Sequence, residues 1–372
     1  MKRLILAGGG HAHLHVLRSL ATTHWPDVEV VLISPHPRQI YSGMLPGWIA
    51  GHYRIDQCAA ALKPLAEAGG VRILQDHVIG IDADQRIVRC AGVGKLAGDI
   101  EYDLISLDTG ALVDASALAT TDATLLPIRP LEAFVAGWER QLDRFTQAGS
   151  ARLAVVGAGA AGVELALAVR TRLANLLGAD RATVVLIEGR GVLAGHGDRV
   201  IRAVSRQLAL HGVVRLAGHV AGAPGGLVFA DGRMLAVDCV IGTTGAIPAP
   251  WLATSTLALA NDGFIAVDAT QRSTSHPQVF AAGDVASRVD RPHAKSGVYA
   301  VRAGPPLCHN LRQSLAGKPL QRHDPQQRSL YLLATGPKVA VVSWAGFTAT
   351  GAWAWRWKDW IDRRFMRQYE IN

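Results

Sequence analysis

Two glycine clusters hold the residues best suited to bind a phosphorylated ligand. Each follows a short apolar run and precedes a helical pattern, and the second cluster reads Gly157-x-Gly159-x-x-Gly162. Glycines at this spacing let the backbone turn sharply and approach a diphosphate, while the helix N-terminus offers free N–H groups and a partial positive charge. The context predicts a dinucleotide site; the alternative is a glycine-rich structural turn in an unrelated α/β domain.

A carboxylate and an arginine bear on which dinucleotide the second cluster binds. Glu188 ends the next apolar run, and Arg190 follows two residues later. A carboxylate at this position accepts hydrogen bonds from the ribose hydroxyls and repels a 2′-phosphate, which favours NADH over NADPH. Arg190 weakens that preference, so NADPH stays an alternative.

The first cluster, Gly8-Gly9-Gly10, is a less regular fingerprint. His13 occupies the place of the third glycine, and Ser34 stands where the acidic residue is expected. Beside a complete second fingerprint it predicts a site for another dinucleotide, and FAD is the usual redox partner of NAD(P)H. His11 and His15 have a spacing that zinc can use, but without a third ligand the sequence predicts no metal.

A further acidic side chain comes at the end of another apolar run. Val279-Phe280-Ala281-Ala282 is followed directly by Gly283-Asp284. Open α/β sheets bind their ligands at the carboxyl ends of the strands, so Asp284 is a candidate ligand-binding residue. The alternative is that Asp284 caps the helix that follows.

The elements that must position these residues alternate between strand and helix. Strands are expected at 2–7, 28–33, 72–74, 102–107, 152–156, 184–187, 213–216, 239–242 and 279–281. Helices are expected after each glycine cluster, to Leu20 in the first case and over 163–177 in the second. Two βαβ units result, which predict parallel sheets and an α/β fold with two Rossmann-like domains. The stretch 126–130 is a candidate linker, and 248–250 a candidate junction.

Composition limits the class of protein. The 372 residues carry a net charge of +8 and are 49% hydrophobic and 18% charged, which describes a chain with a large core and argues against disorder. Four cysteines, at 58, 90, 239 and 308, form no CxxC pair, which excludes a disulfide scaffold and fits a reducing cytoplasm. No apolar run reaches the ~18 residues of a membrane-spanning helix, and no nucleic-acid-binding module is recognisable.

In their order along the chain, these motifs resemble those of the flavoproteins with two dinucleotide-binding domains, the pyridine nucleotide–disulfide oxidoreductase superfamily. The matching pieces are the first glycine cluster, Thr109-Gly110, Gly157–Glu164, Thr244-Gly245-x-x-Pro248 and Val279–Asp284. The resemblance covers nearly the whole chain and implies FAD in the first unit and NADH in the second. The FAD-binding residues that it implies are Gly8, Gly10, His11, Ala12, Ser34, Pro35, Ser42, Thr109, Gly110, Gly283 and Asp284. The NADH-binding residues that it implies are Gly157, Gly159, Gly162, Glu188, Thr244 and Gly245.

The same resemblance narrows the second half-reaction. Disulfide reductases of the superfamily carry a CxxxxC pair beside the flavin, but the corresponding stretch 41–47 has no cysteine. That stretch looks like the one in type II NADH:quinone and sulfide:quinone oxidoreductases, where a Leu-Pro turn, here at Pro46, lies against the isoalloxazine ring. Residues 8–13, 33–35 and 41–53 are also similar to a subfamily often fused to selenophosphate synthetase.

Two helices carry further residues with implied roles. In type II dehydrogenases a glutamate at the position of Glu164 lies near the nicotinamide and the flavin; the alternative is an ordinary, partly buried helix glutamate. Lys295-Ser296-Gly297 opens a helix that runs to about Leu315, and similar flavoproteins direct this helix at the flavin. Lys295 is therefore expected to stabilise negative charge on the reduced ring. Ala303 departs from the glutamine of many relatives, which leaves the acceptor open.

These observations predict an FAD-binding domain over 1–115 and 250–322, an NAD(P)H-binding domain over 116–249, and a C-terminal segment over 323–372. The expected function is an FAD-dependent NAD(P)H oxidoreductase that passes hydride from NADH to the flavin and then electrons to a quinone-like acceptor. One alternative is a reductase of selenium or sulfur metabolism, including the sulfide:quinone type. Another is a flavin-binding partner protein with little turnover.

The C-terminal residues 351–372 combine four tryptophans with five basic residues. Helical spacing predicts one face that carries Trp353, Trp357, Trp360, Ile361 and Phe365. A basic amphipathic helix with tryptophan can lie in a membrane interface, which suits a quinone acceptor. The alternative is that this face packs on the flavin domain or forms a homodimer. The expected location is the cytoplasm, either free or at the inner face of the membrane.

Overall fold

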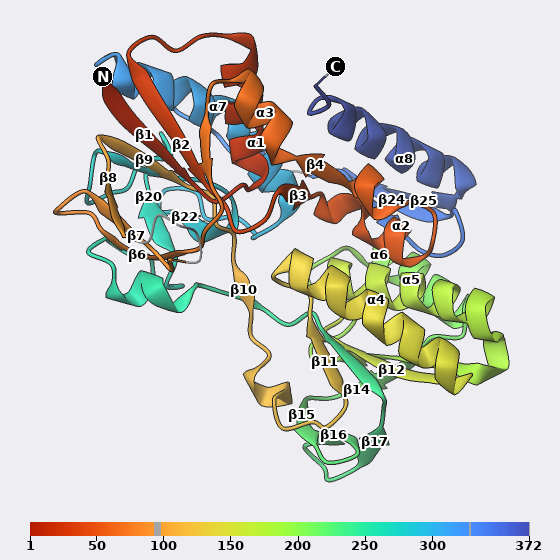
Figure 1. The fold of residues 1–372 in the computed structure, drawn as a ribbon. Coiled ribbons are helices and arrows are strands. Elements are labelled where there is room, and N and C mark those ends of the chain that lie inside the picture. Colours follow the sequence, from red (N-terminus) through yellow and green to blue (C-terminus); the bar gives the residue numbers. More distant parts are fainter. Residues whose placement is uncertain (93–97, 327–328, 372) are drawn as a thin grey trace.

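A computed structural model describes residues 1–92, 98–326 and 329–371 of the chain. The backbone forms two α/β units, each built on a five-stranded sheet, and a C-terminal segment that contacts both (Figure 1). All strand pairs within the two five-stranded sheets are parallel. The predicted α/β class with two Rossmann-like sheets is therefore confirmed.

The first unit contains the first glycine cluster. Its strand order is β21 (Val279–Ala281), β9 (Leu104–Leu107), β1 (Lys2–Ala7), β2 (Val28–Ile33) and β5 (Arg72–Leu74). One face is covered by α1 (His11–Thr22), α3 (Leu62–Ala68) and α7 (Gly297–Leu315), and the other by β6 (Val78–Asp82), β7 (Ile87–Cys90), β8 (Asp99–Glu101), β20 (Ile265–Val267) and β22 (Ala286–Arg288). Both faces are buried, which explains the uninterrupted apolar strands.

The second unit contains the second glycine cluster. Its strand order is β11 (Thr124–Pro127), β18 (Cys239–Gly242), β12 (Ala151–Val156), β13 (Ala182–Glu188) and β14 (Val214–Ala217). One face is covered by α4 (Leu131–Ala148), α5 (Ala160–Leu177) and α6 (Asp198–Leu210), and the other by β15 (Val220–Ala223), β16 (Gly226–Phe229) and β17 (Met234–Ala236). The two units therefore share one three-layer design.

Two short strands carry the chain between the units. They are β10 (Leu112–Val113) and β19 (Ala246–Ile247), which pair in antiparallel orientation (Figure 1). The interpretation of 126–130 as a linker is wrong, because Leu126 and Pro127 belong to β11 at the edge of the second sheet. Pro127 is tolerated there because an edge strand leaves N–H groups outside the ladder. The predicted domain boundaries, just after β10 and just after β19, stay predictions.

The C-terminal segment bridges the two units. It forms the antiparallel sheet β23 (Tyr331–Ala334), β24 (Ala340–Trp344) and β25 (Phe347–Gly351), followed by α8 (Ala352–Arg367). The sheet contacts α5 and α6, whereas the last turn of α8 packs into the core of the first unit through Phe365 and Met366. Figure 1 shows this segment in blue beside α2 (Leu45–Ile49) and above α6.

The helix predicted for the tail is confirmed, but the residues of its predicted apolar face differ in burial. Phe365 is buried, whereas Trp353, Trp357 and Trp360 are 44%, 38% and 50% exposed. The five predicted residues therefore do not share one packed face. Among the described residues, no helix is both long and apolar enough to cross a membrane.

The remaining elements are short. They are β3 (Arg38–Ile40), β4 (Ala59–Ala61) and the 3-10 helices η1 (Ser42–Met44), η2 (Ile55–Cys58), η3 (Ser116–Leu118), η4 (Ala179–Arg181), η5 (Pro250–Thr254) and η6 (Gly283–Val285). β3, η1 and α2 connect the carboxyl end of β2 to the interface between the units, so this connection brings residues 38–49 beside α5.

Candidate functional site

A cavity of about 350 Å³ lies at the carboxyl ends of the strands of the first sheet. Ten of the residues predicted for the FAD site line it: Gly8, Gly10, His11, Ser34, Pro35, Ser42, Thr109, Gly110, Asp284 and Gly297. They come from six separate stretches of the chain, and the parallel sheet gathers them because the strands end at one edge. Polar and glycine-rich walls at this edge suit a phosphorylated ligand.

Asp108, which the sequence analysis did not single out, is the central acid of this cavity. Its Oδ2 accepts the backbone N–H groups of Ala12, at 2.8 Å, and His13, at 3.0 Å. The side chain therefore lies at the N-terminus of α1. Burial raises the pKa of Asp108 to about 7. The hydrogen bonds from the two N–H groups act in the opposite direction and lower this pKa, but burial outweighs them. The only sequence signal was its place directly before Thr109-Gly110, at the end of β9.

The glycines of the first turn are required by the packing around Asp108. Gly8 has a φ of +93°, and a Cβ there would lie 2.7 Å from the carbonyl carbon of Asp108. A Cβ on Gly10 would overlap the Asp108 carboxyl group, and one on Gly283 would lie 2.6 Å from its Oδ1. Three glycines predicted to bind FAD are thus also needed to make room for a buried side chain.

The two first histidines of α1 have different environments. His13 Nδ1 donates to the carbonyl of Gly8 at 2.6 Å, so Nε2 accepts from the Ser106 hydroxyl at 2.8 Å. Burial lowers the pKa of His13 to about 4, and the ring therefore replaces the third glycine as a neutral packing group. His11 also has a pKa lowered by burial to about 4, but its Nε2 has no hydrogen-bond partner among the described residues. A buried, unpartnered nitrogen in a cavity wall indicates a missing ligand atom.

Asp284 forms an ion pair that the sequence did not predict. Its Oδ2 lies 2.5 Å from Nη2 of Arg129, and both side chains line the cavity. Arg129 precedes α4 and so belongs to the second unit, 155 residues away in sequence from η6 (284 − 129). The pair joins the two units across the cavity and leaves Asp284 with a positive partner.

The N-terminus of α7 faces the cavity, but Lys295 does not. Gly297 begins the helix, and a Cβ there would lie 3.0 Å from the Ser42 hydroxyl oxygen. Ser296 is the N-cap residue. The Lys295 ammonium donates to the carbonyl of Ala286 at 2.5 Å and to the Ser287 hydroxyl at 2.7 Å. The expected contact of Lys295 with the reduced flavin is therefore not supported, because its charge is held beside β22.

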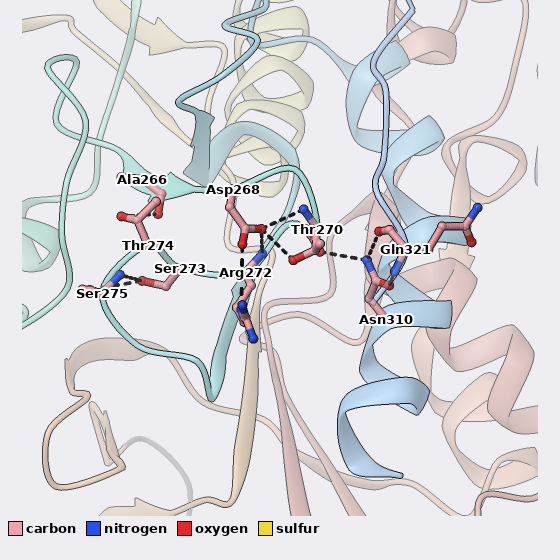
Figure 2. A network of polar contacts seen from close by, with 9 residues as sticks. All are labelled: Ala266, Asp268, Thr270, Arg272, Ser273, Thr274, Ser275, Asn310 and Gln321. Carbon is pink, nitrogen blue, oxygen red and sulfur yellow. Dashed lines mark hydrogen bonds and ion pairs between the residues drawn. The ribbon is translucent and has the colours of Figure 1, made fainter. Parts of the chain in front are cut away.

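A buried asparagine fixes α7 relative to the strands (Figure 2). Asn310 Nδ2 donates to the carbonyls of Thr270 and Gln321, at 2.9 and 2.8 Å, and its Oδ1 accepts the Gln321 N–H at 2.8 Å. Asp268 in turn accepts the N–H and hydroxyl of Thr270. The network ties α7, at Asn310, to the turn that follows β20.

The second glycine turn lies at the carboxyl end of β12. Gly157 has a φ of +110°, and a Cβ on Gly162 would overlap the Gly157 carbonyl oxygen. A Cβ on Gly159 would meet no other atom within 4 Å, so this residue faces open space, as expected for a glycine beside a ligand. Thr243 closes the turn by donating to the carbonyls of Val156 and Gly157, both at 2.9 Å. Of the next two residues, the Thr244 hydroxyl donates to the carbonyl of Asp114, and Gly245 has open space beside it.

Glu188, predicted to bind a ribose, is held by an arginine. Its two carboxylate oxygens accept from Nε and Nη2 of Arg215, at 2.6 and 3.1 Å. Arg215 is on β14, the neighbouring strand, and sequence spacing did not reveal it. The carboxylate is buried beneath a partly exposed guanidinium, so a ribose at this site would meet both charges.

Glu164 belongs to a second buried cluster, between α5 and the C-terminal segment. Its Oε1 accepts the N–H of Ala334 at 2.8 Å, and burial raises its pKa to about 7. The nearby Lys358 ammonium donates to the Gly43 carbonyl at 2.6 Å and to Asp362 at 2.7 Å. The charge of Lys358 lowers the pKa of Glu164, against the effect of burial.

Two further residues complete the surroundings of this cluster. Tyr41 hydrogen-bonds to the Asp362 carboxylate, and burial together with the charge of that carboxylate raises the pKa of the Tyr41 hydroxyl. Pro46 is buried in the first turn of α2, which packs on α5 rather than in the cavity wall. Sequence reasoning missed the roles of Lys358 and Asp362 because it counted them among the charges of the amphipathic tail, for which membrane contact and internal packing both stayed open.

Comparison with known proteins agrees with this architecture. Residues 2–310 match the family described as pyridine nucleotide-disulphide oxidoreductase. An alternative NAD(P)H-ubiquinone oxidoreductase C1 of Arabidopsis thaliana is 26% identical over 332 residues, which cover 77% of this chain and 62% of that protein. Demethylphylloquinone reductase of Synechocystis is 24% identical over 366 residues, covering 94% and 88%.

A solved structure has the same fold. NDH2 from Plasmodium falciparum, in complex with NADH, superposes with a TM-score of 0.81 over 100% of both chains at 12% identity. The present chain thus spans 62% of the length of the Arabidopsis relative and the whole of this structural neighbour. With the family match over most of its length and two glycine turns at the ends of two parallel sheets, the chain belongs to the pyridine nucleotide-disulphide oxidoreductase family.

Proposed function

We propose that this protein is an FAD-dependent NAD(P)H oxidoreductase that oxidises NADH and passes the electrons to a quinone-like acceptor. The observation that carries the proposal is the presence, in one chain, of two glycine turns, each at the carboxyl edge of its own parallel sheet. Relatives whose names state quinone reduction support the acceptor.

The residues of the first cavity fit a flavin dinucleotide. Its walls offer close backbone approach at Gly8 and Gly10, and the unpartnered Nε2 of His11 supplies a polar atom that a ligand would satisfy. Residues 34–35, 109–110 and Asp284 would hold the remainder. When bound, FAD would supply the two-electron redox chemistry that side chains lack.

The second turn fits NADH. Gly157 and Gly159 would admit the diphosphate at the N-terminus of α5, with Glu188 and Arg215 at the adenosine ribose. Glu164 lies on α5 four residues after its start at Ala160, on the side covered by β23. The protein would orient the nicotinamide and exclude water there, because positioning is the main contribution of the chain to hydride transfer.

The cluster around Glu164 and Lys358 would handle the protons of the second half-reaction. Reduction of a quinone to a quinol takes up two protons. The Glu164 carboxyl, with a pKa near 7, can hold or release one at neutral pH, and the other would come from solvent. Lys358 keeps its proton, because the charges of Asp362 and Glu164 outweigh burial and raise its pKa, so it would supply a fixed positive charge. Asp362 holds Lys358 in place, because its carboxylate accepts one of the ammonium hydrogens.

The cysteines favour this acceptor over sulfide. All four thiols are unpaired, and burial raises the pKa of Cys58 to about 12 and that of Cys90 to about 11. Thiols with raised pKa values are poor nucleophiles at neutral pH.

Anaerobic mixing of purified protein with NADH tests the proposal. The visible absorbance of the flavin should bleach, and addition of a short-chain quinone should restore it, whereas NAD⁺ alone should change nothing. Unbleached absorbance with both NADH and NADPH would overturn the dehydrogenase assignment. Reoxidation by a selenium or sulfur compound but not by the quinone would overturn the acceptor.

The exposed tryptophans of α8 are proposed to meet a membrane surface. Trp344 and Phe347, at 58% and 56% exposure, add two exposed aromatic side chains on the β24–β25 hairpin, which contacts α8, and α8 also carries exposed arginines. Tryptophan beside arginine is typical of interfacial helices, and the acceptor would be dissolved in the bilayer. Co-sedimentation with anionic lipid vesicles should fall in Trp357→Ser/Trp360→Ser. If the double variant binds vesicles like the wild-type protein but no longer forms a dimer, this surface is a homodimer contact.

A further inference from the structure

The carboxyl group of Asp108 lies where the first glycine turn would receive a diphosphate. Asp108 lines the cavity between Gly10 and Gly283 and is only 4% exposed. Its Oδ2 already accepts two N–H groups from the first turn of α1, whereas Oδ1 lies 2.6 Å from the place that a Cβ on Gly283 would take, at the start of η6. An acidic side chain therefore adjoins a site expected to bind a dianion.

The charges around Asp108 do not neutralise it. His11 and His13, on α1, are both neutral because burial lowers their pKa values to about 4. Asp284, on η6, repels a charged Asp108, and Arg129, before α4, is committed to Asp284 at 2.5 Å. No ion pair to Asp108 is present within the described ranges. An ionised Asp108 beside a diphosphate would thus be a like-charge contact in a buried place, which is strongly unfavourable.

We infer that Asp108 is a diphosphate-binding residue that takes up a proton when FAD binds, keeps Oδ2 on the N–H groups of α1, and donates the new O–H to a diphosphate oxygen. The inference rests on the proposed FAD site. The proton comes from solvent, and no covalent bond to the ligand forms. Asp108 therefore contacts the dinucleotide as a neutral carboxylic acid and not as a second anion.

The consequence is a pH dependence with a definite sign. Since the pKa of the free protein's Asp108 is about 7, the acid is already protonated below about pH 6, and binding takes up no proton there. Above about pH 7.5 binding should take up close to one proton per FAD, and the dissociation constant should rise about tenfold per pH unit. His11 would give the opposite trend, because protonation of a histidine of low pKa requires low pH.

Isothermal titration of flavin-depleted protein with FAD, in pairs of buffers of different ionisation enthalpy, measures this uptake directly. Wild-type protein should show uptake near zero at about pH 6 and near one at about pH 8. Asp108→Asn, whose amide mimics the neutral acid as acceptor and donor, should show no uptake and a flat dissociation constant. Asp103→Asn serves as the matched control: this exposed carboxylate lies just before β9, at the opposite end of the strand from Asp108 and outside the cavity, so the variant should keep the wild-type uptake.

The outcomes separate the inference from the function on which it rests. Binding of FAD with no uptake at about pH 8, or with the same uptake in Asp108→Asn, would overturn the role of Asp108 and leave the flavin site intact. Uptake that grows as pH falls would assign the proton to His11 and overturn the inference. No binding of FAD at any pH would overturn the proposed function together with the inference.

Discussion

Glu188→Gln should shift the dinucleotide preference of this protein from NADH toward NADPH. In the native chain both Glu188 oxygens accept from Arg215, at 2.6 and 3.1 Å, so the guanidinium that could bind a 2′-phosphate is occupied. The substitution removes the carboxylate charge, releases the guanidinium and keeps the size of the side chain.

The magnitude follows from the two charges. A hydrogen bond to a charged group contributes about 1.5–3 kcal/mol, and relief of carboxylate–phosphate repulsion near the surface adds about 1 kcal/mol. The Arg215 side chain is 37% exposed, so solvent screening reduces the sum to about 2 kcal/mol. The ratio of the NADPH and NADH dissociation constants should therefore change about 30-fold.

Titration with ADP-ribose and with its 2′-phosphate measures this ratio without turnover. Arg215→Gln is the matched control. It removes the positive charge that attracts a 2′-phosphate and leaves the Glu188 carboxylate that repels it, so the ratio should change in the opposite direction, toward NADH. A ratio that stays within about twofold in Glu188→Gln would refute the reasoning, because it would show that neither charge faces the adenosine ribose.

Three further predictions test other parts of the structure. Gly162→Ala should lower the free energy of unfolding by about 1–3 kcal/mol, because the added Cβ would overlap the Gly157 carbonyl oxygen. Its control, Gly159→Ala, should keep the wild-type stability in thermal unfolding but weaken binding in a titration with NADH. Lys358→Met should cost about 3–5 kcal/mol in urea unfolding, because the Asp362 side chain, 5% exposed, loses its cation; an added Asp362→Asn should recover part of the loss. Glu164 has a pKa raised from 4.5 to about 7, so wild-type stability should fall relative to Glu164→Gln as pH rises from about 4.5 to about 7, and a parallel pH profile would contradict the burial of this carboxyl group.

Local patterns predicted most of the fold. The strands β2, β5, β18 and β21 lie at the predicted residues, because apolar runs bounded by turn residues encode buried parallel strands locally. The errors have tertiary causes. Leu126 and Pro127 resemble a linker in sequence, but pairing with β18 makes them a strand. Phe365 shares a helical stripe with the exposed tryptophans, yet it is buried because its ring packs against His11 and Tyr41 of the first unit.

By itself the sequence determined the two glycine turns, the strands that precede them and the acid that follows β21, since each depends on neighbouring residues and on backbone geometry. Only the tertiary structure decided which charges meet. Arg129 reaches Asp284, Arg215 reaches Glu188, and Lys358, besides its helical neighbour Asp362, reaches the carbonyl of Gly43. Most of these partners come from separate elements, and the energy of a charge depends on its burial and its neighbours, which spacing along one chain does not specify. The protonation of the site is therefore a property of the fold.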